Sequence, residues 1–227
     1  MSVSVVVPCY NEPSARVRET VRSALAASCD EVVLVDDGSE TSIELAEARV
    51  VRTEHRGIAH ALNTGTKAAR GDYLCWLSVG DTMRTNKIRQ QYRFMRELGS
   101  AASFHDYVNG KGASGVFRSR PKWREKLETD NQFCGSTAMV LRDVALGCPW
   151  DESLTYAVDW DWACRVEFDG PGWDYLQEVL GAAFELPGGH TMTAEATPDL
   201  WAKKCKDRLV VHKRWRRANR IARKTAK

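Results

Sequence analysis

Short apolar runs alternate with longer amphipathic stretches along the first part of the chain. Near-continuous apolar runs lie at 3–7, 32–35 and 73–77, a pattern typical of strands buried on both faces of a parallel sheet. Between the first two runs, apolar residues such as Val17 and Val21 recur at helical spacing, which indicates a helix with one buried face. The alternation predicts an α/β fold with a mostly parallel sheet and right-handed crossovers.

The same pattern places the elements along the chain. We expect helices over 13–28, near 41–48, from about 57 to 70 and over 159–168, and strands over 31–35, near 49–53, over 73–77, 135–142 and 173–186. Pro13 in a first turn and the terminating Gly71 set two of these boundaries. Loops or turns are expected at 109–115 and 187–189, and Pro198 is expected to open a final helix.

The composition is that of an ordinary globular protein, with 43% hydrophobic and 28% charged residues. No run approaches the roughly 20 apolar residues needed to span a bilayer, and the N-terminus carries no basic segment followed by a cleavage site. The seven cysteines show neither a CxxC pair nor zinc-type spacing with histidine. We therefore expect reduced thiols and a cytoplasmic location.

Charge is divided unevenly along the chain. Residues 202–227 contain 12 Lys or Arg and one acidic residue, Asp207, whereas the rest of the chain is acidic. The apolar and aromatic positions that recur here at helical spacing are Trp201, Cys205, Leu209, His212 and Trp215. Such a helix suits an anionic membrane surface, and a basic segment also suits nucleic acid. The structural alternative is a helix whose tryptophan face packs on the acidic body.

Polar residues follow the ends of three predicted strands. They are Pro8, Tyr10 and Glu12 after the first strand, Asp36 and Asp37 after the second, and Asp81 after the third. Ligands of open α/β sheets bind at the carboxyl ends of strands, so we expect one shared crevice. Neither a GxGxxG fingerprint nor a P-loop is present. Two carboxylates can instead read base and ribose while a metal at Asp81 neutralises phosphates, which suits a nucleotide-sugar donor.

Four segments together resemble the family 2 glycosyltransferases, inverting enzymes of the GT-A fold. The segments are 3–12, 33–39, 55–63 and 69–81, and they occur in the family's order and at its usual spacing. The resemblance covers about residues 2–193. It implies a Rossmann-like sheet flanked by helices, and it implies direct displacement of a nucleoside diphosphate, with UDP as the first expectation, by an acceptor hydroxyl.

A domain organisation follows from the resemblance. Residues 1–193 would form the GT-A domain, with a nucleotide-sugar-binding half over 1–100 and an acceptor-side half over 101–193. Residues 194–227 would form a basic amphipathic C-terminal helix. The acceptor would be a glycan, a lipid-linked molecule or a protein. Because many relatives use lipid-linked acceptors, we expect 198–227 to attach the protein peripherally to the inner face of the membrane.

The resemblance also implies roles for residues on the donor side. Pro8, Tyr10 and Glu12 would line the nucleoside pocket, Asp37 would accept a hydrogen bond from the base with Asp36 in support, and Arg56, Gly57 and Asn63 would pass beside the donor. The segment 78–81 aligns with the metal motif of the family. Ser78, a donor-side contact, and Gly80 stand at positions that are often acidic. Asp81 alone would therefore hold Mn²⁺ or Mg²⁺, with diphosphate and water completing the shell.

On the acceptor side, the resemblance implies a carboxylate that deprotonates the acceptor hydroxyl. The Glu-Asp pair of the family aligns with Val158 and Asp159, so Asp159 is the favoured base. Asp161 is the second candidate, although residues two positions apart on a helix point away from each other. Gly135 and Ser136 would lie on the strand that backs the donor sugar.

Structural explanations stay open for several of these residues. Asp36 and Asp37 precede Gly-Ser, which is good turn chemistry. Asp81 could cap a helix that follows it, and Asp159 could be a charge favoured at a helix start. His190 aligns in an offset register with a family histidine, so it would contact the metal or diphosphate or be a loop residue.

Two other functions compete with glycosyl transfer. A catalytically degenerate module that binds nucleotide-sugars or glycans is suggested by Ser78, Gly80 and Val158 at positions that are usually acidic. A nucleotidyltransferase would also use an α/β sheet and a metal. It would need a glycine-rich signature with Lys or Arg after the first strand, and that signature is missing.

Overall fold

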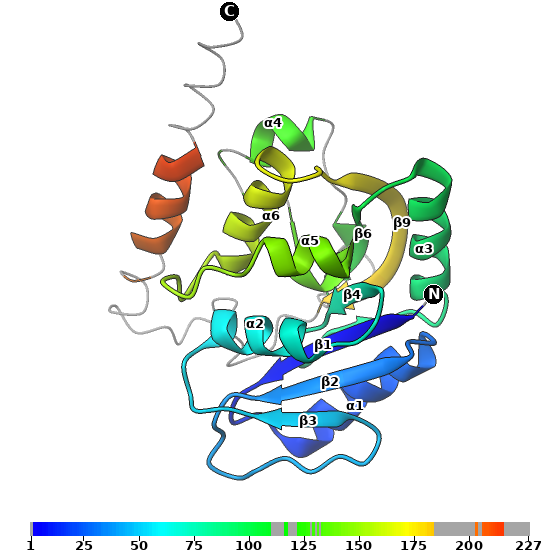
Figure 1. The fold of residues 1–227 in the computed structure, drawn as a ribbon, viewed down its shortest axis with the longest axis vertical. Coiled ribbons are helices and arrows are strands. Elements are labelled where there is room, and N and C mark those ends of the chain that lie inside the picture. The colour runs from blue at the N-terminus through cyan, green and yellow to red at the C-terminus, as the bar shows by residue number, and fades with distance from the viewer. Residues whose placement is uncertain are drawn as a thin grey trace, which may run out of the picture.

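The computed structural model describes residues 2–109, 116–117, 122–127, 129, 131, 133–183, 203 and 206–215. These residues form one curled sheet with helices on both sides (Figure 1). The expected loops at 109–115 and 187–189, Pro198 and His190 lie wholly or mostly outside the described residues. Within the described residues, no helix is long and apolar enough to cross a membrane.

Strands and helices alternate through the first half of the chain, as expected. The elements are β1 (Val3–Cys9), α1 (Ser14–Ala26), β2 (Glu31–Asp36), β3 (Arg49–Arg52), α2 (Ile58–Ala68), β4 (Tyr73–Trp76), β5 (Thr82–Met83) and α3 (Lys87–Leu98). In the second half they are β6 (Ala102–Asn109), β7 (Val116–Phe117), α4 (Trp123–Leu127), a 3-10 turn η1 (Gly135–Thr137), β8 (Met139–Leu141), α5 (Arg142–Gly147), α6 (Val158–Phe168) and β9 (Asp174–Ala183).

The sheet is parallel in its first half and mixed in its second half. Its strand order is β3-β2-β1-β4-β8-β6-β9-β5, and β7 pairs with β6. The strands β3, β2, β1 and β4 are mutually parallel. β8 joins antiparallel to β4 and β6, and β9 runs parallel to β6. The mostly parallel sheet was therefore predicted correctly for the strands that carry the donor-side motifs.

Alternate side chains of the central strands enter two different cores. Because successive strand residues face opposite sides, Val6 packs on the α2 side, whereas Val5 and Val7 pack on the α1 side. Full burial of one valine contributes about 1.5–3 kcal/mol. α2 approaches β1 so closely that a Cβ added at Gly65 would lie 2.3 Å from Cγ1 of Val6. A glycine is therefore required at that helix position.

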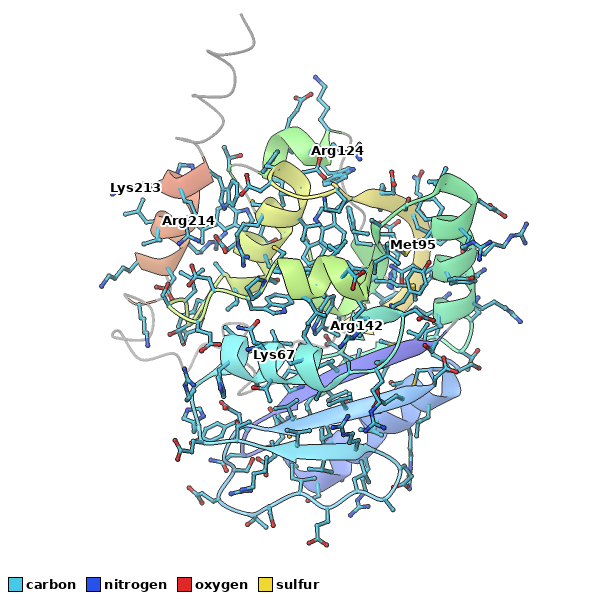
Figure 2. All side chains as sticks on the ribbon, viewed as in Figure 1. Lys67, Met95, Arg124, Arg142, Lys213 and Arg214 are labelled. Atoms are coloured by element: carbon cyan, nitrogen blue, oxygen red, sulfur yellow. The ribbon has the colours of Figure 1, made fainter. Side chains whose placement is uncertain are left out.

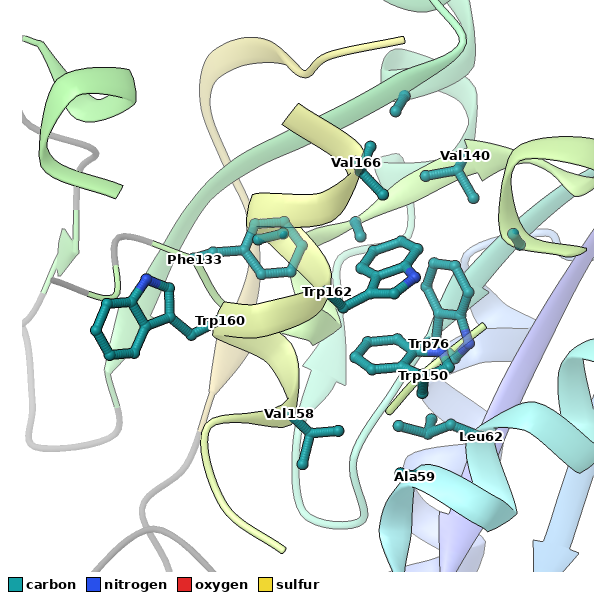
Figure 3. Close-up of a cluster of buried hydrophobic side chains, with 14 of the residues drawn as sticks. Ala59, Leu62, Trp76, Phe133, Val140, Trp150, Val158, Trp160, Trp162 and Val166 are labelled. Atoms are coloured by element: carbon teal, nitrogen blue, oxygen red, sulfur yellow. The ribbon is translucent and has the colours of Figure 1, made fainter. Parts of the chain in front are cut away.

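An aromatic cluster surrounds α6 (Figure 3). The ring of Trp162 stacks on Trp150 with centroids 4.5 Å apart and meets the edge of Trp76 at 4.8 Å. The indole nitrogens of Trp160 and Trp162 are satisfied, since Trp160 donates to the Leu127 carbonyl at 2.6 Å and Trp162 donates to the Cys148 carbonyl at 2.7 Å. α6 is buried on nearly all sides, which fixes the helix that begins beside Asp159.

One expected helix was wrong, one alternative explanation is excluded, and one expected strand is shorter than predicted. Residues 41–48 form turns and bends without a helix, because one short turn of helix is costly to nucleate and only Leu45 there is buried. Asp81 caps no helix, since β5 follows it and α3 begins at Lys87. The expected strand over 135–142 is the turn η1 followed by β8 and the start of α5.

The described part of the basic C-terminal segment is helical. Residues 206–215 form a helix, here called helix 206–215, that lies beside α6 (Figure 1). Val211 and Trp215 are buried in the same core as α6, whereas Leu209 and Val210 are exposed. Trp201 and Cys205 lie outside the described residues. The described residues favour packing on the body.

Candidate active site

The carboxyl ends of β1, β2 and β4 meet at one edge of the sheet. Cys9 pairs with Asp36 in the β1–β2 ladder, and the Asp37 amide donates to the Cys9 carbonyl at 2.9 Å. On the other side of β1, the Leu77 amide donates to the Val6 carbonyl at 3.0 Å. The loops after the three strands therefore leave the sheet side by side, as the sequence predicted.

Asp36 is the inward-facing member of the acidic pair. It is fully buried, and it accepts hydrogen bonds from the Ser39 amide at 2.9 Å and from Arg52 at 2.5 Å. Burial alone would raise its pKa, but the Ser39 hydrogen bonds and the Arg52 charge outweigh burial and hold the pKa below its usual value. Asp36 thus braces the loop that follows β2.

Asp37 holds the loop between β3 and α2. Its Oδ1 accepts from the Thr53 hydroxyl at 3.3 Å and the Arg56 amide at 3.1 Å. Its Oδ2 accepts from the Gly57 amide at 2.9 Å and from Nδ1 of His55 at 2.8 Å. Gly57 has a φ of 95°, a conformation that glycine adopts without strain. This carboxylate therefore fixes both Arg56 and Gly57 beside the donor-side edge.

The Tyr10 ring lies over the same loop. It stacks on the His55 ring with centroids 3.8 Å apart and an interplanar angle of 14°. Tyr10 is exposed, whereas Pro8 is buried within β1, and Glu12 pairs with Arg16 at 3.3 Å. Of the three residues expected to line the nucleoside pocket, Tyr10 is the exposed one. Sequence reasoning assigned no role to His55.

Asn63 joins the donor-side half to the acceptor-side half. Its side chain donates to the Trp150 carbonyl at 3.0 Å and to Glu152 at 2.9 Å, and it accepts from the Trp150 amide at 2.8 Å. Arg56 reaches the other oxygen of Glu152 at 3.0 Å. Glu152 is thus a site residue that sequence reasoning missed, because it lies 89 positions from Asn63.

Asp81 meets the acceptor-side half through η1. The Ser136 hydroxyl donates to Oδ2 of Asp81 at 2.5 Å, and the Ser78 amide donates to the Ser136 hydroxyl at 3.2 Å. The Gly80 amide donates to the Thr20 hydroxyl at 2.9 Å, which anchors the segment to α1. Ser78, Asp81 and Ser136 are therefore brought together, although the sequence placed Ser136 on a strand.

A divalent cation at Asp81 can be tested against these residues. Mn²⁺ and Mg²⁺ take shells of about six oxygen ligands. Among the residues that the structure describes, no three His, Cys, Asp or Glu side chains converge as metal ligands. Asp81 and the Ser136 hydroxyl therefore fit such a cation only where a diphosphate and water supply the remaining ligands.

Asp159 lies at the first turn of α6, across η1 from Asp81. The residue before the helix, Ala157, has a φ of 57°, so the chain turns sharply into α6. Asp159 accepts from the Trp160 amide at 2.8 Å and the Asn131 amide group at 3.3 Å. A Cβ added at Gly135 would lie 3.9 Å from the Cβ of Asp159. The small residue at 135 leaves room beside this carboxylate.

The pKa of the Cys134 thiol is affected by both Asp81 and Asp159. Burial raises the pKa of Cys134 most, and the charges of Asp81 and Asp159 raise it further. On the donor side, the pKa of Cys9 is raised to about 12 by burial and then by Asp36, Glu12 and Asp37. Both thiols therefore stay protonated beside an acidic edge.

Asp161 lies in a different environment from Asp159. It is fully buried, and it accepts from Arg165 at 2.8 Å and from Arg214 of helix 206–215 at 2.6 Å. Trp215 approaches the same carboxylate at 3.4 Å. Asp161 thus anchors helix 206–215 to α6, and the structure does not bring it to the edge with Asp81.

A known protein family matches the part of the chain from β1 to α5. The family described as Glycosyl transferase family 2 matches residues 4–145. The chain belongs to this family. The family match ends before Asp159 and α6. The case for including residues beyond 145 in the candidate site therefore depends on the structure and on their own sequence pattern.

Curated relatives of the family cover parts of the chain. GlyG, a glycosyltransferase of Streptococcus pneumoniae serotype 4, is 32% identical over 127 residues, which are 51% of this chain and 42% of GlyG. An uncharacterised glycosyltransferase of Rickettsia bellii is 28% identical over 186 residues, which are 70% of this chain and 26% of the relative. The chain spans between 21% and 56% of the length of the rickettsial relatives.

Solved structures of glycosyltransferases share the fold. TarS residues 1–349 from S. aureus in complex with UDP-GlcNAc align with a TM-score of 0.67 and 19% identity, over 89% of this chain and 64% of that chain. The mannosyltransferase PcManGT from Pyrobaculum calidifontis with GDP-Man and Mn²⁺ aligns at 0.63 and 20%, over 83% and 58%. This family 2 chain therefore has the GT-A fold that the sequence predicted.

Proposed function

We propose that this family 2 chain transfers a sugar from a nucleoside diphosphate to an acceptor hydroxyl, with inversion at the anomeric carbon. The proposal rests most on one observation. Asp81 and Asp159 flank the turn η1, and Asp37 follows β2, which is separated from β4 by β1 in the same sheet. A base contact, a leaving-group site and a proton acceptor are the three polar functions that such a transfer needs.

The donor side of the proposal uses Tyr10 and Asp37. Tyr10 offers an aromatic ring on which a base can stack, and Asp37 offers a carboxylate oxygen that can accept from a ring N–H group, although the His55 ring holds both positions in this structure. Arg56, held by Asp37 and Glu152, lies where it can meet an anionic donor. The relative WfaP of Escherichia coli is named a UDP-Glc:α-D-GlcNAc-diphosphoundecaprenol β-1,3-glucosyltransferase, and it is 29% identical over 132 residues, 53% of this chain and 52% of WfaP. UDP is therefore the first donor nucleotide to test.

The diphosphate would leave beside Asp81. Asp81 would hold Mn²⁺ or Mg²⁺, and the cation would neutralise charge on the departing diphosphate. Ser136 keeps the Asp81 carboxylate in place through its hydroxyl. Because one carboxylate holds a hard cation weakly, the protein should gain metal affinity when nucleotide is present.

Asp159 would accept the proton of the attacking hydroxyl. The Trp160 amide and Asn131 orient its carboxylate, and Gly135 leaves space next to it. Asp161 is better suited to a structural role, because each of its buried carboxylate oxygens binds an arginine side chain. Within residues 1–193, the donor half at 1–100 and the acceptor half at 101–193 would then each supply one side of the reaction.

The proposal extends to the acceptor and to a connection with the membrane. A glycan, a lipid-linked molecule or a protein each offers a hydroxyl. Peripheral attachment through 198–227 would have to use residues other than Val211 and Trp215, which are buried against the body. Pelleting with anionic liposomes would test it, and equal weak binding by full-length protein and a variant truncated before residue 216 would argue against it.

One experiment tests the catalytic proposal. Binding of UDP, GDP and dTDP is measured by calorimetry with and without Mn²⁺, and hydrolysis of the matching sugar donors is followed. Asp81→Asn should abolish the metal-dependent part of nucleotide binding. Asp159→Asn should lower turnover by about 10²–10⁴-fold while nucleotide affinity stays unchanged, since it removes only the proton acceptor.

Asp143→Asn is the matched control, because Asp143 is an exposed acidic residue on α5. It should behave like the wild type in both assays. Nucleotide binding without any turnover, unaffected by Asp159→Asn, would favour the degenerate binding module suggested by Ser78, Gly80 and Val158. Binding of no nucleotide would reject the proposal.

A further inference from the structure

The His55 ring is bound in the way that a nucleobase would be. It stacks face to face on the exposed Tyr10 ring with centroids 3.8 Å apart. Its Nδ1 lies 2.8 Å from Oδ2 of Asp37 and 3.1 Å from the Asp37 carbonyl oxygen, so an N–H group at this atom donates to Asp37. A planar ring that stacks on an aromatic face and donates an N–H to a carboxylate is what a base would offer.

His55 and a base cannot share this place. Insertion of a base between Tyr10 and His55 would need about twice their separation, because each stacked pair requires its own van der Waals distance. Asp37 is also fully engaged, since each of its oxygens already accepts two hydrogen bonds. The position that offers both a ring face and this carboxylate is the one that His55 holds.

We propose that His55 is a gating residue of the donor site, whose imidazole must leave Tyr10 and Asp37 before the donor base can bind there. This inference rests on the proposed function of Tyr10 and Asp37. It adds a residue for which the family resemblance implied no role.

The surroundings of His55 allow the ring to move while the loop stays in place. Its side chain is 50% exposed, whereas that of Asp37 is 4% exposed. The backbone at 55 is packed against Gly38, where an added Cβ would lie 2.7 Å from the His55 nitrogen. Asp37 keeps the amides of Arg56 and Gly57 when the imidazole turns away. Rotation of one side chain therefore opens the site.

The exchange of an imidazole for a base also predicts which bases can enter. The group that replaces His55 must donate a ring N–H to Oδ2 of Asp37, as the imidazole does. Uracil, thymine and guanine carry such a ring N–H, whereas the corresponding ring nitrogen of cytosine is an acceptor. A carboxylate facing an acceptor leaves two unpaired groups, which is costly in a partly buried site. We therefore expect CDP to bind much more weakly than UDP.

Removal of the gate should strengthen nucleotide binding. In His55→Ala, the free protein no longer has a stacked ring and a hydrogen bond that UDP must displace. We expect UDP to bind about tenfold more tightly, equivalent to about 1.4 kcal/mol. His212→Ala on helix 206–215 is the matched control, because it removes a histidine away from Tyr10 and Asp37, and its UDP affinity should equal that of the wild type.

The outcomes separate the gate from the proposed function. Tighter UDP binding by His55→Ala alone supports the gate. Unchanged affinity overturns the gate while the donor site stands, and weaker affinity also overturns it, because His55 would then be a wall on which the base stacks. If neither wild type nor His55→Ala binds any nucleotide, the proposed function fails and the gate fails with it.

A measurement on the wild type guards against a variant that unfolds. The imidazole resonances of His55 sense the Tyr10 ring current while the two rings stack. Saturation with UDP should move these resonances toward free-histidine positions, whereas those of His212 should stay. Resonances of His55 that do not move at saturating UDP would overturn the gate without any substitution.

Discussion

Asp36 and Asp37 are adjacent in the sequence, yet their side chains bind different partners. Successive strand residues face opposite sides of a sheet, so Asp36 turns to Arg52 and the Ser39 amide. Asp37 turns to the loop that carries His55 and Gly57. The structural explanation left open by the sequence therefore applies to Asp36, which supports the turn, whereas Asp37 organises the edge where a donor is proposed to bind.

The lowered pKa of Asp36 predicts a pH-dependent contribution to stability. Its pKa is below the ordinary 3.8 in the folded protein, so the folded state binds a proton less readily than the unfolded state. The contribution is present above about pH 4 and is lost as the pH falls through the folded-state pKa. Arg52→Met should therefore lower the free energy of unfolding at neutral pH, and this difference should shrink in acid.

Urea denaturation at about pH 7 and about pH 3 measures that difference. Arg93→Met is the control, because Arg93 forms an exposed pair with Glu97 and exposed pairs contribute about 0–1 kcal/mol. An Arg52→Met penalty of equal size at both pH values would mean that the arginine acts through packing or through the Ser39 carbonyl, to which it also donates at 2.6 Å.

At the scale of elements, helix 206–215 supports α6. Asp207 accepts from the amides of Thr155 and Tyr156, both at 3.0 Å, and so holds the segment that leads into α6. Arg214 binds Asp161 within α6 and Asp151 before it, the latter at 2.9 Å. The helix therefore fastens the chain on both sides of the turn that presents Asp159.

Arg214 and Lys213 give a direct test of this role. They are neighbours on helix 206–215 (Figure 2), and both are exposed, but Arg214 forms ion pairs with Asp151 and Asp161. Arg214→Met leaves Asp161 with one arginine partner, and removal of one partner from a buried pair is destabilising. Because Arg165 remains and Arg214 is itself 37% exposed, we expect a loss of about 1–3 kcal/mol, below the usual cost of such a removal.

Lys213→Met should change the free energy of unfolding by no more than about 0.5 kcal/mol, as exposed substitutions usually do. Thermal and urea unfolding of both variants provide the measurement. Equal stability of the two variants would show that the Arg214 contacts contribute nothing, and helix 206–215 would then be held by its other contacts, among them those of Asp207, Val211 and Trp215.

Elements with strong apolar patterns were predictable, and those shaped by distant contacts were not. β1 and β2 have continuous apolar runs because both faces are covered, and α1 shows one clear stripe. The 3-10 turn η1 had no such signal. It forms because Thr137 donates to the Cys134 carbonyl at 2.7 Å and Gln91 of α3 donates to the Thr137 carbonyl at 3.0 Å, and the second contact joins residues 46 positions apart.

At the scale of the whole molecule, two of the sets of hydrogen bonds that join residues 1–100 to residues 101–193 lie at the candidate site. One set connects Asn63 and Arg56 to Glu152, and the other connects Asp81 to Ser136. The first lies at the loop that binds Asp37, and the second lies beside Asp159. If nucleotide orders the loop between β3 and α2, the motion of the backbone in the segment before α6 should therefore decrease as well.

Hydrogen exchange can measure this connection. UDP should slow amide exchange over 150–157 in the wild type. In Glu152→Ala this protection should be reduced, because Asn63 and Arg56 lose their shared partner. Glu97→Ala removes an exposed acidic residue of α3 and should leave the protection intact. Full protection in Glu152→Ala would show that the link carries no coupling.

The candidate site was only partly readable in the sequence. Asp37, Asp81 and Asp159 follow element boundaries and family motifs, so their positions were predicted without coordinates. His55 and Glu152 have no local signal, because their contacts depend on how the loop after β3 meets Tyr10 and the segment before α6. Asp161 illustrates the reverse case, since its spacing from Asp159 gave no sign of the two arginines that bind it.

The pairing of Arg214 with Asp161 also has a consequence for the order of synthesis. Chains emerge from the ribosome with the N-terminal part first, so α6 is made well before its partner arginine. Until helix 206–215 arrives, Asp161 has Arg165 alone, and the Thr155 and Tyr156 amides lack their acceptor. The contacts around α6 are therefore completed last in the nascent protein, after the strands that precede Asp37 and Asp81 have already been made.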